Sequence, residues 1–176
     1  MFAVILLSGM MLGQATEPQA AASPHSVQGT WTQQTPGPEL QEHLDQAVGD
    51  VVSDLNIMIR ELARRKLSGV TKVCGEYVLS VEPTVVRLGC DGGPVHVLPR
   101  DGQPYQTTNP AGQPVQGTVE VTDEAVILSW QGGAGKRVNH FERSEAGLRL
   151  SVTVSSENMP RPLKWQVDYG RSPDPR

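Results

Sequence analysis

From residue 70 to residue 169 the chain alternates apolar and polar residues in short runs separated by turn-forming residues. The clearest run, residues 148–155, places four aliphatic side chains on one face of an extended segment and four polar side chains on the other. Such a run is typical of a strand with one buried face. About eight strands of this kind predict an antiparallel meander closing as a barrel or half-barrel, since closure removes exposed strand edges.

Turn-forming residues divide this region into segments of strand length. Gly and Asn supply the positive φ angles of tight turns and Pro fixes φ, so each cluster marks a place where the chain can reverse. A short first strand is expected from Val27 to Trp31. The other segments with strand character are residues 71–80, 84–90, 95–98, 105–108, 115–122, 125–131, 137–144, 148–155 and 163–169.

Residues 38–66 follow a different period, with apolar residues at intervals of three and four, which predicts one long amphipathic helix after the first strand. Pro38 suits the first helical position and Gly69 lies just past the end. Gly49 and Asp50 could bend the helix or divide it in two, because Gly weakens a helix interior. The expected fold class is therefore mainly β (α+β).

The first 22 residues have the pattern of a signal peptide. An uncharged apolar run at residues 2–12 precedes small residues, with cleavage expected after Ala15 or Ala22. The run is too short to be a stable membrane span. Residues 23–28 are expected to be a flexible lead-in, residues 29–171 a single domain and residues 172–176 a tail. The expected location is secreted or periplasmic.

Charge and motifs exclude several classes of function. A net charge of −4 and a pI near 5.5 argue against nucleic acid as a partner, and the cluster Arg64, Arg65 and Lys66 suits the end of a helix. The polar side of the whole 38–66 segment mixes acids and bases, so it lacks the basic face that anionic lipids select. The glycine-rich loop 132–136 lacks the order of a phosphate loop. The protein partner stays unknown.

No cofactor, metal site or catalytic group is expected. The four histidines do not have the spacing of metal ligands, and two cysteines without a Cys or His partner at ligand spacing do not suggest zinc. The chain also has no nucleophile-elbow sequence. The sequence is therefore interpreted as that of a non-enzymatic protein.

Cys74 and Cys90 are expected to form a disulfide. If strands 71–80 and 84–90 form a hairpin in which Val78 faces Val86, then Cys74 faces Cys90 at a separation that a disulfide can bridge. A two-residue turn would instead pair Cys74 with Asp91, and the two cysteines could then not form a disulfide.

Two short motifs give the chain a resemblance to the lipocalins. Gly29-Thr30-Trp31 opens the first strand and Tyr169-Gly170-Arg171 ends the last one. The chain resembles lipocalin-like (calycin-type) secreted bacterial domains of unassigned function. The resemblance implies an eight-stranded barrel in which Trp31, of the Gly-x-Trp motif that Gly29 opens, closes the base and Arg171 packs across it. The helix after the first strand departs from the family, which usually carries its helix after the barrel.

A closed sheet would enclose the apolar faces of its strands. An eight-stranded barrel can hold one small ligand or be filled by its own side chains. The preferred interpretation is binding of a small apolar ligand inside the sheet. The alternative is a protein-interaction or envelope-structural module with a filled core. The candidate lining residues are Trp130, Leu128, Leu150, Val152, Trp165 and Val167.

Overall fold

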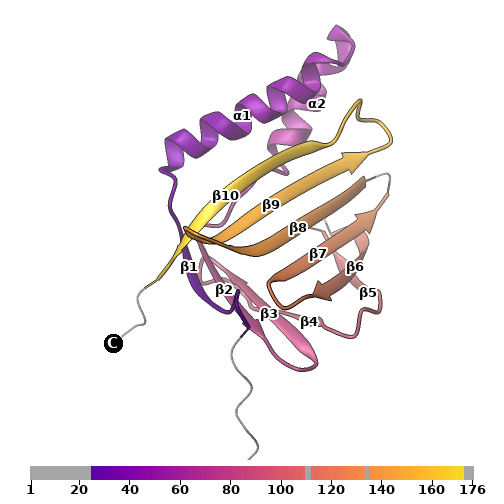
Figure 1. Cartoon of the computed structure of the whole chain (residues 1–176). Coiled ribbons are helices and arrows are strands. Elements are labelled where there is room, and N and C mark those ends of the chain that lie inside the picture. Colours follow the sequence, from indigo (N-terminus) through magenta and orange to yellow (C-terminus); the bar gives the residue numbers. More distant parts are fainter. Residues whose placement is uncertain (1–24, 110–111, 134, 173–176) are drawn as a thin grey trace, which may run out of the picture.

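A computed structural model describes residues 25–109, 112–133 and 135–172, and within them all strands belong to one antiparallel sheet (Figure 1). Its strands along the chain are β1 (Gly29–Gln33), β2 (Glu76–Val81), β3 (Val85–Cys90), β4 (His96–Pro99), β5 (Tyr105–Thr108), β6 (Pro114–Val121), β7 (Ala125–Gly132), β8 (Gly135–Ser144), β9 (Gly147–Ser156) and β10 (Leu163–Arg171). The signal-peptide prediction lies outside the described residues.

The first strand of the chain lies inside the sheet and joins its two halves. The order is β4-β3-β2-β1-β10-β9-β8-β7-β6-β5, so β1 pairs with both β2 and β10. In Figure 1 the half from β10 to β6 lies in front of the half from β1 to β4, which gives a nearly closed barrel. The predicted fold class, a mainly β (α+β) protein with an antiparallel barrel-like sheet and helix after the first strand, is confirmed. The described sheet has ten strands where about eight were expected, and it includes two four-residue edge strands, β4 and β5.

The helical segment forms two helices after β1, α1 (Gly37–Ser53) and α2 (Ile57–Ser68). The break lies at Asn56, not at Gly49, which stays inside α1. The Asn56 side chain accepts a hydrogen bond from the Met58 backbone N–H at 3.0 Å and so starts a new helix. Arg60 donates to the carbonyl oxygen of Ser53, the last residue of α1, and to that of Leu55, in the link between the helices.

The helix α1 packs its apolar face on the barrel beside β10 (Figure 1). The buried residues of α1 are Leu40, Leu44, Val48, Val51 and Val52. They join one core with the inward residues of the strands. Arg161, between β9 and β10, pairs with Asp54 and donates to the Asp50 carbonyl oxygen, which ties the end of α1 to the sheet.

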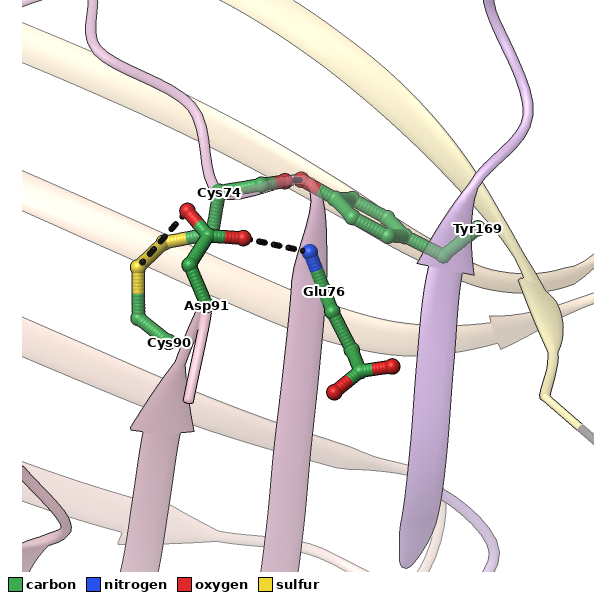
Figure 2. Close-up of a disulfide and its surroundings, with 5 residues drawn as sticks. All are labelled: Cys74, Glu76, Cys90, Asp91 and Tyr169. Atoms are coloured by element: carbon green, nitrogen blue, oxygen red, sulfur yellow. Dashed lines mark hydrogen bonds between the residues drawn. A yellow bond between two sulfur atoms is a disulfide. The ribbon is translucent and has the colours of Figure 1, made fainter. Parts of the chain in front are cut away.

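The predicted disulfide is present, but the predicted register of its hairpin is wrong. Cys90 pairs with Tyr77 across β2 and β3, not with Cys74, and Val78 faces Gly89. Cys74 lies in the irregular segment before β2, and that segment brings its Cα to 5.6 Å from that of Cys90. Figure 2 shows the carbonyl of Cys74 accepting a hydrogen bond from the Tyr169 hydroxyl, and Asp91 accepting one from the Glu76 backbone N–H. The bond therefore fastens the α2–β2 connection to the sheet.

Replacing both cysteines with alanine is expected to lower the free energy of unfolding by about 3 kcal/mol, because the bond closes a loop across a sequence separation of 16. Urea unfolding of the variant and of the parent chain, both without reductant, measures the difference. Labelling of the unfolded, non-reduced parent should find no reactive thiol. Two reactive thiols, or equal urea midpoints, would contradict this expectation.

Candidate functional site

The inward face of the barrel is apolar on β9 and β10 but partly polar on β8. Val152 of β9 is paired with Trp165 on the neighbouring strand β10 and with Asn139 on the other neighbouring strand, β8. Opposite Val154 lies Arg137. Since side chains opposite each other share a face of the sheet, Arg137 and Asn139 belong to the same inward face as these apolar residues.

Arg137 is a partly buried cation without an acidic partner among the described residues. Its Nε donates to Asn139 Oδ1 at 2.9 Å, and its Nη1 donates to the Val70 carbonyl oxygen at 2.8 Å. Its guanidinium lies 5.6 Å from the centroid of the Trp165 ring. Burial lowers the pKa of Arg137, and Tyr77 opposes that shift. An arginine has five N–H groups, so these contacts leave donors of Arg137 unused.

The indole of Trp165 adds a further unused donor. Trp165 is only 7% exposed, and its Nε1–H has no hydrogen-bond partner among the described residues. Asn139, which holds Arg137, is only 5% exposed. A buried polar group without a partner costs free energy, so the unpaired indole N–H of Trp165 beside the Arg137 cation forms a site suited to an acceptor with negative charge.

Aromatic residues lie next to this cluster. The rings of Tyr77 and Phe141 are 5.2 Å apart and those of Tyr77 and Tyr169 are 5.3 Å apart, both edge to face. Burial raises the pKa of Tyr77 to about 12, although Arg137 opposes the shift. Burial also raises the pKa of Tyr169, whose hydroxyl donates to the Cys74 carbonyl. Both phenols therefore stay neutral at physiological pH.

The structure places the predicted lining residues on the same inward surface. Leu150 faces Val167, Val152 faces Trp165, and Trp130 faces Arg137 across neighbouring strands. Leu128, Leu150, Val152 and Val167 are buried, whereas Trp130 is partly exposed. Sequence reasoning missed Arg137 and Asn139. The available signal was spacing: Arg137 lies four residues and Asn139 two residues before Phe141, which places all three on one face of a strand.

The opposite end of the barrel holds Trp31. This residue is fully buried, and its Nε1 donates to the Val27 carbonyl oxygen at 2.9 Å. The guanidinium groups of Arg143 and Arg171 lie 5.2 and 5.9 Å from its ring centroid. The structure thus places Arg171 across Trp31, where the lipocalin resemblance would have it. It adds a second arginine, from β8, to the same ring.

Two concavities lined by described residues lie outside the barrel interior. One, of about 350 Å³, lies between α1 and the segment after α2 and includes Gln33, Leu44 and Thr71. The other, of about 610 Å³, lies at the β8–β9 turn and includes Arg143 and Arg149. Neither includes a predicted lining residue.

The described residues contain one group of side chains close enough to share a metal ion, formed by Cys74, Cys90 and Asp91. Both sulfurs are committed to the disulfide, so this group is not a metal centre. Within the same residues, no helix is long and apolar enough to cross a membrane.

Comparison with known proteins found no matching family model and no matching curated protein. Similar solved structures include human cRBP IV, with 14% identity over 85% of this chain and all of that chain and a TM-score of 0.49. A fatty acid binding protein of Schistosoma mansoni in complex with arachidonic acid has 12% identity over 84% and 97% of the two chains and a TM-score of 0.49. The REP1-NXSQ fatty acid transporter has 11% identity over 83% and 96% and a TM-score of 0.46.

Proposed function

We propose that this protein is a non-enzymatic, extracytoplasmic carrier that binds one small amphiphile inside its barrel. The bound molecule has an apolar body and an anionic head group. The observation that carries the proposal is Arg137, a partly buried guanidinium with no acidic partner among the described residues and with the buried, unpaired Nε1–H of Trp165 beside it. An anionic head group would use donors that the chain leaves unused and would compensate the charge of Arg137.

The apolar body of the ligand would take the adjoining inward surface, lined by Leu128, Val152 and Val167. These side chains are packed together, so a ligand must displace part of the barrel's own filling. Trp130 and Tyr105 are partly exposed and are the aromatic side chains best placed to move. Tyr105 lies on the edge strand β5 with its ring against Gly117, where a Cβ atom would stand only 2.2 Å from the ring.

Replacing Arg137 with methionine is expected to weaken binding of dodecanoate by about 10- to 100-fold, since a hydrogen bond to a charged group contributes roughly 1.5–3 kcal/mol. Binding of dodecanol, which has the same chain but no charge, should change by less than about threefold. Both affinities can be measured by displacement of a fluorescent fatty-acid probe. Lys136→Met, at the exposed neighbouring position, is the matched control and should leave both affinities unchanged.

A second variant separates a binding role of Arg137 from a structural one. Arg137→Met leaves the buried Asn139 side-chain oxygen without its donor, so it should lower the free energy of unfolding of the empty protein by about 1–3 kcal/mol. Asn139→Ala removes the same hydrogen bond but keeps the guanidinium, so it should lower stability by a similar amount while dodecanoate affinity falls by less than about threefold. Unchanged dodecanoate affinity in Arg137→Met, or no binding of either amphiphile by the parent chain, would refute the proposal.

A filled interior favours a second candidate, a protein-interaction or envelope-structural module. Leu128, Leu150 and Val152 are 0–1% exposed, which is the packing of an ordinary core. Native mass spectrometry of the purified protein distinguishes the two candidates. A one-to-one complex with an anionic amphiphile supports the carrier, whereas an empty protein that takes up no added amphiphile supports the module.

A further inference from the structure

The helix α2 leaves large apolar side chains in solvent. Among its residues Leu67 alone is buried, whereas Ile57 is 77%, Met58 88%, Ile59 49% and Leu62 57% exposed. We call these four exposed residues the α2 apolar tip. Figure 1 shows that the joined ends of α1 and α2 extend beyond the strands of the barrel. Large exposed apolar patches on a folded protein mark interaction surfaces.

The same helix is strongly basic. Its twelve residues contain Arg60, Arg64, Arg65 and Lys66 against Glu61, an excess of three positive charges in a chain of net charge −4. The expectation that this face lacks basic character is therefore wrong for α2. It took the charges of residues 38–66 together and expected any division at Gly49 and Asp50, whereas the break at Asn56 separates the acidic residues of α1 from the basic residues of α2.

The contacts of these charges leave part of the basic surface available. Arg60 is used to cap α1 and Arg65 pairs with Glu61, but Arg64 and Lys66 form no ion pair with a described residue. Asp54, an acid close to the tip, is paired with Arg161. Met58, Leu62 and Lys66 are four residues apart and so lie along one side of the helix, with the apolar groups toward the tip.

We propose that α2 docks the protein on an anionic lipid bilayer, with the α2 apolar tip inserted among the acyl chains and its basic residues on the head groups. A helix with exposed apolar residues and adjacent Lys and Arg suits this interface, and charge attraction to anionic lipid adds to apolar insertion. A second copy of this chain is a poorer occupant, because a symmetric contact would bring two cationic helices together. The docking is peripheral and requires no ligand in the barrel.

The test is cosedimentation of the full chain with vesicles of phosphatidylglycerol and phosphatidylcholine in equal parts, and with vesicles of phosphatidylcholine alone. Binding should be at least tenfold stronger to the anionic vesicles and should weaken in 0.5 M salt. The double variant Met58→Asp and Leu62→Asp should lose at least tenfold in affinity. Lys66→Gln should lose about fivefold. Val97→Asp, at an exposed valine on β4, and Lys164→Gln, at an exposed lysine on β10, are the matched controls and should bind as the parent does.

Several outcomes would overturn the assignment. Equal binding to neutral vesicles would remove the role of charge. Binding that survives the double variant would place the contact elsewhere, including the apolar run at residues 2–12. A concentration-dependent dimer that the double variant abolishes, without vesicle binding by the parent, would assign the tip to a second copy. The amphiphile affinity of the barrel is measured separately without vesicles, so failure of the docking leaves that proposal to its own result.

Discussion

Replacing Trp31 with alanine is expected to lower the free energy of unfolding by about 3–5 kcal/mol, which is the usual range for truncating a buried aromatic side chain to alanine. Trp31 is fully buried at one end of the barrel, and its indole N–H is hydrogen-bonded to the Val27 carbonyl. The guanidinium groups of Arg143 and Arg171 lie over its ring. The change removes the packing, the hydrogen bond and both cation–π contacts together. Urea unfolding followed by far-ultraviolet circular dichroism measures the loss.

Trp31→Phe tests the same site if the alanine variant does not fold. Phenylalanine keeps an aromatic ring under the two arginines but cannot donate to Val27, so a loss of about 1–2 kcal/mol is expected. Arg171→Ala removes a single cation–π contact near the surface and should cost about 0.5–1 kcal/mol. A loss below 1 kcal/mol for Trp31→Ala would show that this tryptophan does not hold the barrel end together.

The strands with strict alternation were predictable from sequence. β9 and β10 lie within two residues of their predicted bounds, because apolar and polar residues alternate along almost the whole of each strand. The register of β2 against β3 was not predictable. It depends on the geometry of the turn around Glu82 and Pro83, and a shift in pairing leaves the alternation of each strand unchanged. The disulfide was still predicted correctly, because the irregular chain before β2 brings Cys74 back to Cys90.

The position of the helix break was predicted wrongly, at Gly49 and Asp50, for a related reason. Apolar residues continue at intervals of three and four across the true break, from Leu55 to Ile59 and Leu62, so periodicity does not mark it. What starts α2 is a local hydrogen bond from the Met58 backbone N–H to the Asn56 side chain, and an Asn in the sequence does not by itself identify a cap. The consequence for function is direct. Only after the break is located do the basic residues separate from the acidic ones.

The polar cluster in the barrel was missed because β8 has no apolar face. Arg137, Asn139 and Phe141 point inward, while Val138 and His140 alternate with them on the outer face. Both faces therefore mix polar and apolar residues, and periodicity alone cannot say which is buried. Pairing with β9, whose apolar face is unambiguous, decides the orientation. The candidate site thus depends on a register that only the structure supplies.

Replacing Gly147 with alanine is expected to destabilise the fold by about 3 kcal/mol or more. Gly147 begins β9 with a φ of +133°, where an L-residue is strained, and an added Cβ would stand 2.4 Å from the backbone oxygen of Tyr169. That oxygen belongs to the paired strand β10, so it cannot move away as a flexible side chain could. The strain and the overpacking each cost roughly 1–3 kcal/mol. The urea midpoint should fall accordingly.

Gly133→Ala is the matched control for Gly147→Ala. Gly133 also has a positive φ, +54°, but nothing lies within 4 Å of an added Cβ. Its substitution carries only the conformational cost, about 1–2 kcal/mol. A Gly147 variant that loses no more than the Gly133 variant would mean that β9 and β10 separate locally without cost at this point. Since Trp31 Cζ3 stands only 3.4 Å from the same added Cβ, the barrel end around Trp31 would then be loosely packed, and the large loss expected for Trp31→Ala should not occur either.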